Sequence, residues 1–268
     1  MLLIILGLTL LILVQMDFVV TALSSGHHGP FTRRLSLGCW HLLQALQGRI
    51  GGRFLHSYSG LIVLTVVTLT WLLLTTLAWL LIFGGASSSL VMRSTDEPAN
   101  WLQTLSFVGS ALSTMGAANA SPVNGWWGIW GAVAAANGFV LLTLSVTYIL
   151  TVMQTVAAGR SFALLVNSLD PADKSYTTTY AENLAQLVSQ LTSVPMALYY
   201  SSSRRDLRLT LAISRFATVV ARSPDLWPIY LPSFQALPGL TTAGDEVTLE
   251  EVTGWAARYS LTRESAPQ

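Results

Sequence analysis

The chain has 268 residues, of which 52% are hydrophobic and only 10% are charged. Soluble globular domains carry about 25% charged residues, so this composition excludes an ordinary soluble protein and predicts a membrane protein. A net charge of +1 without a strongly basic patch argues against a nucleic-acid partner. The single cysteine, Cys39, excludes an intrachain disulfide framework and a multi-cysteine metal site.

Three apolar stretches are long enough to cross a bilayer, which requires about 20 apolar residues per helix. They comprise residues 2–23, 60–84 and 126–157. The second and third contain no ionisable residue, and the third begins with three tryptophans where an interfacial aromatic belt would lie. We therefore predict an all-α membrane protein with three transmembrane helices.

The first stretch also has features of a cleaved signal peptide. It lacks basic residues at its start, however, and its apolar run is longer than usual for such peptides, so we interpret it as a retained span. Asp17 lies near its end and allows two interpretations, a functional carboxylate within the membrane or a side chain at headgroup level. We expect the second, and we expect Asp17→Asn to leave ion conductance intact.

Residues 24–57 form a basic linker with four arginines and no acidic residue. By the positive-inside rule this linker is cytoplasmic, which places the N-terminus outside and the C-terminus inside a multi-pass protein of the plasma membrane. Residues 35–46 predict an amphipathic helix lying on the inner leaflet. The linker also holds all four histidines, but their spacing matches no zinc pattern: His27, His28, His41 and His56.

The segment between the second and third spans predicts a short helix followed by irregular backbone. Asp96 and Glu97 precede Pro98, which is typical of a helix start, and apolar residues then recur at three- and four-residue spacing as far as Leu112. Irregular backbone at membrane depth is tolerated only where it is buried in protein or lines a water-filled path. We therefore predict a re-entrant half-helix, whose partly negative C-terminal end suits a cation.

The residues after this helix resemble the potassium-channel filter, usually written T-V-G-Y-G-D-x-x-P. Here they read Thr114-Met115-Gly116-Ala117-Ala118-Asn119-Ala120-Ser121-Pro122. They lie between an outer and an inner helix, as in that superfamily, and Gly138 follows near the usual position of the gating hinge. The chain looks most like prokaryotic members of the potassium channel family that have an extra N-terminal span and a helical cytoplasmic tail. The resemblance covers about residues 60–157.

The resemblance implies a homotetramer in the lipid bilayer, because one loop cannot surround an ion. It further implies that K⁺ or another monovalent cation is held by the backbone carbonyls of Thr114, Met115, Gly116 and Ala117. Polar residues of the third span are candidates for the cavity lining: Asn137, Thr143, Thr147 and Thr151.

This filter departs from the usual pattern at three positions. Ala117 replaces the aromatic residue, Ala118 the second glycine and Asn119 the aspartate. Because an L-alanine resists the positive φ that glycine adopts, either the turn is built differently or the filter is wider and shorter, which bears on K⁺ selectivity. The alternative to a pore loop is a hairpin of small residues that packs two membrane helices together.

The C-terminal region predicts a helical cytoplasmic domain and is a candidate binding surface for a cytoplasmic partner. We expect helices at about 171–200, 204–222 and 246–260, with an irregular proline-rich stretch at 224–244. The region contains no G-x-G-x-x-G motif, so a nucleotide-binding fold is not indicated.

The predicted domains are an N-terminal helix (1–23), a basic amphipathic linker (24–57), a pore module (58–157, with outer helix 60–84, pore helix and filter 98–122 and inner helix 126–157) and a helical domain (158–268).

Two functions from different classes are compatible with these observations. The first is a cation channel with a tetrameric pore, which needs no cofactor besides the permeant ion. The second is a non-conducting scaffold or sensor that keeps the pore fold and signals through its tail. An enzyme is not expected, because no span contains a Ser/His pair, paired aspartates or a set of metal ligands.

Overall fold

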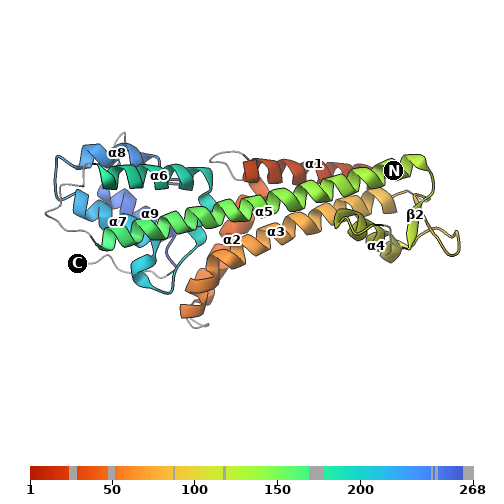
Figure 1. The fold of residues 1–268 in the computed structure, drawn as a ribbon, viewed down its shortest axis with the longest axis horizontal. Coiled ribbons are helices and arrows are strands. Elements are labelled where there is room, and N and C mark those ends of the chain that lie inside the picture. The colour runs from red at the N-terminus through yellow and green to blue at the C-terminus, as the bar shows by residue number, and fades with distance from the viewer. Residues whose placement is uncertain are drawn as a thin grey trace. The chain divides into compact units, whose positions relative to one another are not determined.

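The structure is a computed structural model that describes residues 1–23, 29–47, 52–86, 88–116, 119–168, 178–242, 244 and 247–261. It is mostly helical, with one pair of short strands (Figure 1). In the described part of the chain, three helices are long and apolar enough to cross a membrane. This confirms the prediction of a helical protein with three candidate spans.

The three candidate spans are α1 (Leu2–Leu23), α3 (Gly52–Gly84) and α5 (Gly125–Asn167). The bounds of α1 agree with the prediction, whereas α3 begins eight residues earlier and α5 ends ten residues later than the apolar runs. With 43 residues α5 is about 65 Å long at 1.5 Å per residue. The hydrocarbon core of a bilayer is about 30 Å thick, so α5 extends well beyond one membrane crossing.

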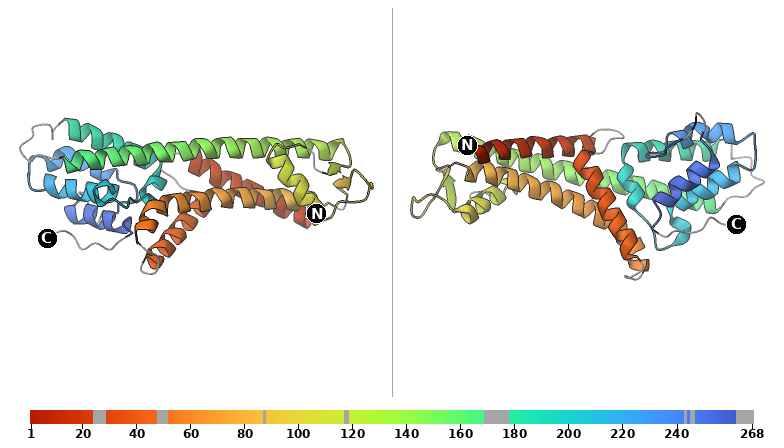
Figure 2. Two further views of the ribbon diagram at one scale, coloured as in Figure 1. Left: turned by 60° about the horizontal axis from the view of Figure 1, so that its bottom comes forward. Right: turned by 180° about the vertical axis from the view of Figure 1, so that it is seen from behind.

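Shorter elements connect and follow these spans. They are α2 (Pro30–Leu46), β1 (Leu90–Met92), α4 (Trp101–Leu112), β2 (Ala120–Pro122), α6 (Thr179–Ser193), α7 (Leu209–Val220), α8 (Trp227–Gln235), α9 (Leu249–Arg258) and the 3₁₀ helices η2 (Pro195–Tyr199) and η3 (Arg205–Leu207). The two strands pair antiparallel, with Val91 opposite Ser121. Figure 2 shows the strand pair near the start of α5 and the end of α3.

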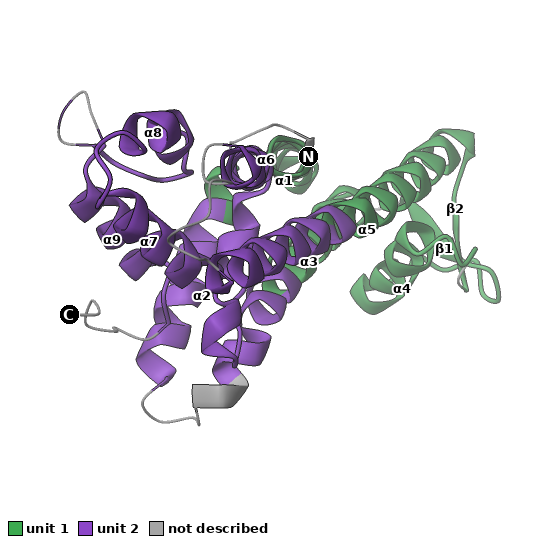
Figure 3. Cartoon of the chain, turned by 60° about the vertical axis from the view of Figure 1, so that its left-hand side comes forward, with its two compact units in different colours: residues 1–23, 28–32, 66–148 green, residues 24–27, 33–65, 149–268 purple. Residues whose placement is uncertain are grey.

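The chain divides into two compact units (Figure 3). Unit 1 contains residues 1–23, 28–32 and 66–148, and unit 2 contains residues 24–27, 33–65 and 149–268. Both α3 and α5 contribute residues to each unit. This division differs from the predicted domain boundaries, since the first half of α3 groups with the C-terminal helices.

Unit 1 has a core of aromatic and aliphatic side chains around α4. The buried members come from α3, β1, α4, β2 and α5: Trp79, Ile82, Phe83, Leu90, Phe107, Val108, Leu112, Ala120 and Ala134. Phe83 contacts both Phe107 and Trp127, with ring centroids 5.3 and 5.6 Å apart. The short helix α4 is therefore packed between two candidate spans and is not an exposed loop.

The start of α4 corrects the predicted one. The helix begins at Trp101, and a capping box fixes that end: the Asn100 side chain accepts from the Gln103 backbone N–H, and the Gln103 side chain accepts from that of Asn100. Pro98 instead pairs with Val91 in an isolated β-bridge. An acid–proline pair indicates a helix start only in the absence of a stronger cap nearby, and Asn100 is that cap. The predicted end at Leu112 is confirmed.

Unit 2 is built from amphipathic helices around an aromatic core. Phe216 of α7 is fully buried and its ring lies 4.9 Å from that of Tyr230, 5.6 Å from Phe162 and 5.8 Å from Tyr180. These partners belong to α8, α5 and α6. The single aromatic residue Phe216 thus joins four helices.

The proline-rich stretch contains helix α8, so the prediction of irregular backbone over 224–244 is wrong for residues 227–235. The other described residues of the stretch are irregular, as predicted. Pro228 lies in the first turn, where a missing N–H costs little. Pro232 lies inside the helix, yet Tyr230 and Phe234 are four residues apart, share a face and are both fully buried. Aromatic packing therefore outweighs the loss of one backbone hydrogen bond.

The other C-terminal helices are shorter than predicted. The first comprises α6 and η2, and the expected start at residues 170–171 lies outside the described residues. The second comprises η3 and α7. The capping box at the start of α9 is confirmed, because Thr248 and Glu251 each accept from the other's backbone N–H.

Helix α2 corrects another expectation. Its apolar residues Trp40 and Leu43 are buried inside unit 2 and are not free to contact lipid. The Trp40 indole donates to the carbonyl of Arg258, and Gln44 donates to the carbonyl of Ser260. The predicted amphipathic helix is present, but its apolar face packs on protein.

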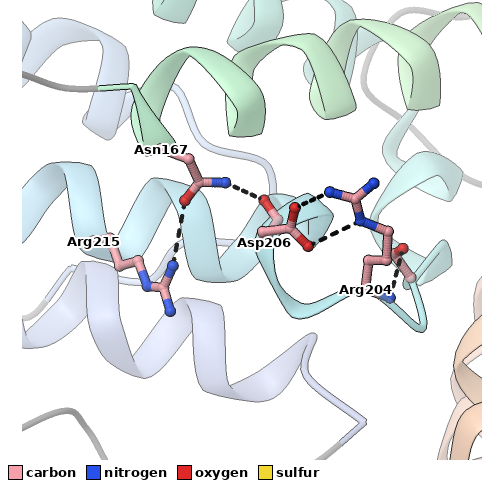
Figure 4. Close-up of polar contacts among 5 residues, drawn as sticks. Asn167, Arg204, Asp206 and Arg215 are labelled. Carbon is pink, nitrogen blue, oxygen red and sulfur yellow. Dashed lines mark hydrogen bonds and ion pairs between the residues drawn. The ribbon is translucent and has the colours of Figure 1, made fainter.

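Polar contacts tie the end of α5 to the segment before α7 (Figure 4). The Asn167 amide donates to the Asp206 carbonyl over 2.6 Å and accepts from Arg215 over 3.4 Å. Arg204 and Asp206 form an exposed ion pair. The hydrogen bond from Arg204 lowers the pKa of the Asp206 carboxyl.

Candidate pore loop

Two glycines bring α4 close to its neighbouring helices within unit 1. A Cβ atom at Gly84 would overlap the Trp101 ring at the start of α4, and one at Gly138 would overlap the Leu112 backbone at its end. Only glycine allows these approaches. The first turn of α4 is therefore held at the end of α3, and its last turn is held against α5.

These contacts define the direction of α4. Gly138 lies thirteen residues after Gly125, the first residue of α5, which corresponds to about 20 Å along that helix. The twelve residues of α4 rise about 18 Å. Near its middle, Phe107 contacts Gly131. Helix α4 thus follows α5 from near its start to the level of Gly138.

The chain then returns to the level at which α4 began. Ala120 pairs with Met92 just beyond the end of α3, and the Asn119 carbonyl accepts from the Arg93 N–H over 2.9 Å. Seven residues, 113–119, connect the end of α4 to this strand pair. We call them the 113–119 loop.

The first part of the 113–119 loop has an unusual backbone. Its first three N–H groups donate to backbone carbonyls in the last turn of α4. Ser113 donates to Gly109, Thr114 to Ala111 and Met115 to Ser110, and each donor–acceptor distance is 3.0 Å. Thr114 has φ +56° and Gly116 has φ +90°. A threonine in the left-handed region is uncommon and costs about 1 kcal/mol.

The described side chains of this loop are not packed inside the chain. Met115 is 85% exposed, and Thr114, Gly116 and Asn119 are exposed as well. The predicted filter residues Ala117 and Ala118 lie outside the described residues. A loop that served only to pack α3 against α5 would bury its side chains between them, and the described ones are not buried.

The sequence on either side of the loop contains no ionisable side chain over a long stretch. Residues 98–159 contain no Asp, Glu, Lys, Arg or His. The partly negative C-terminal end of α4 is therefore not offset by any charge on its own helix, on the loop or on the first 35 residues of α5. Such an end favours a cation over an anion.

The candidate cavity residues of α5 divide into two groups. Thr143, Thr147 and Thr151 are exposed, and the first two donate to the carbonyls of Phe139 and Thr143 in their own helix. Asn137 is half-buried, and its side chain accepts from Gln15 of α1 and Trp79 of α3. The threonines thus lie on the surface of the chain, whereas the Asn137 side chain is hydrogen-bonded to two neighbouring helices.

Gly138 follows Asn137 on α5 and lies beside the end of α4. Its predicted role as a gating hinge stays a prediction, and its position shows a second constraint, the close approach of Leu112.

Asp17 is a buried polar centre, and its expected position at headgroup level stays a prediction. Only 2% of the residue is exposed. Its carboxylate accepts from the backbone N–H groups of Phe31 (2.8 Å) and Thr32 (3.3 Å), from the Thr32 hydroxyl (2.6 Å) and from the Trp71 indole (3.1 Å). Asp17 therefore caps the first turn of α2 and joins α1, α2 and α3.

A sequence signal for this role exists. The residue before Pro30 is Gly29, which has no side chain that caps a helix, so the first N–H groups of α2 need an acceptor from elsewhere. Asp17 is the nearest acidic residue in the sequence. A Cβ at Gly29 would overlap the Asp17 carboxyl, which explains the glycine.

No metal centre is present among the residues that the structure describes, since no three His, Cys, Asp or Glu side chains cluster there. His27 and His28 lie outside this part. His56 pairs with Ser201, with Nδ1 and Oγ 2.8 Å apart.

Comparisons with known proteins place the chain among membrane proteins of unknown activity. No protein-family model and no solved structure matches it. It is similar to a protein of Bacillus subtilis (strain 168) described as the uncharacterized membrane protein YdjJ, with 29% identity over 229 residues. The alignment covers 79% of this chain and 66% of the relative, so the chain spans just under two thirds of that protein. This similarity supports a membrane location and assigns no function.

Proposed function

We propose that the chain is one subunit of a potassium-channel-like cation channel, with the 113–119 loop as its pore loop. The observation that supports this most is the path of α4 and the loop. The helix follows α5 to the level of Gly138, and the chain then returns to the strand pair beside the end of α3. A segment that enters and leaves on the same side is the geometry of a re-entrant loop.

Backbone conformation supports an ion-binding role for the loop. Strained residues cluster at functional sites, and the positive φ of Thr114 falls on the first residue of the filter-like motif. Successive backbone carbonyls can replace the hydration shell of a monovalent cation. In the proposed pore Thr114, Met115, Gly116 and Ala117 supply these carbonyls, and the alanines at 117 and 118 set its selectivity.

Four chains form the proposed pore, because one loop cannot surround an ion. The exposed threonines of α5 are suited to face a wet inner cavity in such an assembly, since these polar residues lie at the surface of the single chain. The proposed topology follows the arginines of residues 24–57, which place this linker in the cytoplasm and the 113–119 loop on the outer side.

Planar-bilayer recordings of the purified protein test this function. We expect current carried by K⁺ or Na⁺ and not by Cl⁻. Gly116→Asp introduces a side chain at a positive φ in the loop and should abolish that current. Gly125→Asp is the matched control, because a Cβ there meets nothing and an acid at a helix N-terminus is favourable. If the wild-type protein carries no current under any condition, the non-conducting scaffold replaces the channel.

A further inference from the structure

Three helices converge on one side-chain oxygen in unit 1. Oδ1 of Asn137 on α5 accepts from Nε1 of Trp79 on α3 over 3.1 Å and from Nε2 of Gln15 on α1 over 3.3 Å. Trp79 is fully buried, and the other two residues are half-buried. Within a bilayer such groups have few alternative partners, so these bonds fix the rotation of α5 about its axis.

This polar contact lies next to the end of α4. Asn137 directly precedes Gly138, whose backbone touches Leu112, the last residue of α4. The Trp79 ring belongs to the same buried cluster as Val108 and Leu112. A rotation of α5 that broke the Asn137 bonds would therefore also change the surface against which the last turn of α4 rests.

The loop depends on that last turn. The N–H groups of Ser113, Thr114 and Met115 all donate to carbonyls of α4 residues 109–111. These N–H groups share planar peptide groups with the carbonyls of Leu112, Ser113 and Thr114, so a shift of this turn also moves those carbonyls.

The N-terminal span has further close contacts with the same helices. A Cβ at Gly7 would meet the Ala78 carbonyl at 2.7 Å, and the rings of Phe18 and Trp71 lie 4.9 Å apart. Helix α1 is thus packed along α3 over several turns, which fixes Gln15 opposite Asn137.

We infer that Gln15, Trp79 and Asn137 are positioning residues for the pore loop, and that α1 helps to position this loop through the hydrogen bond of Gln15. This inference rests on the proposed function. It assigns to the extra N-terminal span a role in setting the geometry of the filter, beyond membrane anchoring.

Two variants remove the hydrogen bonds at similar side-chain volume, Asn137→Leu and Gln15→Leu. Thr143→Val and Thr9→Val are the matched controls on α5 and α1, because these hydroxyls donate within their own helices. Hydrogen–deuterium exchange of peptides covering residues 109–116, measured on the full chain in lipid nanodiscs, reports the state of the last turn without requiring conduction. We expect faster exchange in both test variants and in neither control.

The second readout is the K⁺/Na⁺ permeability ratio from bi-ionic reversal potentials. We expect a change of about threefold or more in the test variants, the size that corresponds to losing one average interhelical hydrogen bond in a membrane protein. If the test variants conduct and exchange faster but keep the wild-type K⁺/Na⁺ permeability ratio, these residues have only a structural role and the inference is overturned.

The two proposals fail in distinguishable ways. If the wild-type protein does not conduct, the proposed function fails, and exchange alone decides whether these residues hold the last turn of α4. If Asn137→Leu does not fold, the milder Gln15→Leu gives the answer, since Trp79 still donates to Asn137 in that variant. Unchanged exchange in a folded Gln15→Leu protein would overturn the role of α1.

Discussion

The two compact units differ in the side chains that they expose. Unit 1 exposes large apolar residues such as Leu13, Leu73 and Phe139 and buries polar ones, including Asp17 and Thr75. Unit 2 buries aromatic residues of amphipathic helices, among them Phe216 and Trp255. An apolar exterior suits lipid or further copies of the chain. In α6–α9 of unit 2, Ile229 is the one large apolar side chain exposed among the described residues, and such a surface suits water.

Different interactions determine how the helices pack in each unit. Helices in lipid gain little from burying more apolar surface, so in unit 1 the polar contacts of Asp17 and Asn137 and the close approach at Gly138 determine which faces meet. In unit 2 the hydrophobic effect supplies the driving force, so the packing of Phe216 and its neighbours decides the arrangement. Substitutions of the two kinds should therefore act differently in the two units.

The largest effect is expected in the aromatic core of unit 2. Phe216→Ala should destabilise the protein by about 3–5 kcal/mol, because it leaves a cavity between four helices. Ile229→Ala on the exposed side of α8 is the control and should change stability by less than about 0.5 kcal/mol. Thermal unfolding of the full chain in detergent measures both. Equal effects of the two would contradict an interior core at Phe216.

A smaller loss is expected at Asp17. Asp17→Asn should cost about 1.5–3 kcal/mol in thermal unfolding, the range for hydrogen bonds to charged groups. One carboxylate oxygen becomes an NH₂ group, which cannot accept from the indole of Trp71 or cap α2 equally well. The expectation that this substitution leaves ion conductance intact stays a prediction, to be checked on the folded variant.

A double-mutant cycle with Trp71→Phe isolates the Asp17–Trp71 contact. Removing the indole donor should cost less in the Asp17→Asn background than in the wild-type background, because the bond is already weakened there. Strictly additive losses would show that Asp17 and Trp71 are not coupled.

The smallest of the three effects concerns close helix packing in unit 1. Gly138→Ala should destabilise the protein by at least about 1 kcal/mol, because its Cβ overlaps the backbone of Leu112. Gly128→Ala on the same helix should stabilise it by about 0.5–1 kcal/mol, since nothing lies within 4 Å of that Cβ. If Gly138→Ala leaves the stability unchanged, Leu112 does not approach Gly138 as closely as the structure shows, and a role of Gly138 as a hinge alone is favoured.

Much of the helical framework could be predicted from sequence, because an uncharged run as long as a bilayer is thick is rare outside membrane spans. The end of α4 at Leu112 and the capping box at Thr248 were also predictable, since their signals are local. The start of α4 was misplaced because two local signals competed, and the Asn100 cap outweighed the acid–proline pair. Helix α8 was missed because its stability comes from the packing of Tyr230 and Phe234, which proline content does not reveal.

The candidate site was only partly predictable for a related reason. The motif at 114–122 identified the loop, but the tryptophan partners of Asn137 and Asp17 lie 58 and 54 residues away, on α3, and no periodicity links them. The amphipathic pattern of α2 likewise shows that one face is apolar without showing what covers it. Contacts between elements distant in sequence required the structure.

The most direct test of the central proposal is whether a reagent attached to the loop blocks the current. Met115→Cys, made in a Cys39→Ser background so that it supplies the single cysteine, replaces an 85% exposed side chain of the 113–119 loop. Val123→Cys in the same background, at a position 44% exposed and just beyond β2, is the matched control. We predict that a membrane-impermeant thiol reagent added from the outer side abolishes current through the Met115→Cys channel and spares the Val123→Cys channel. Complete labelling of the Met115→Cys protein with unchanged current would contradict the pore loop.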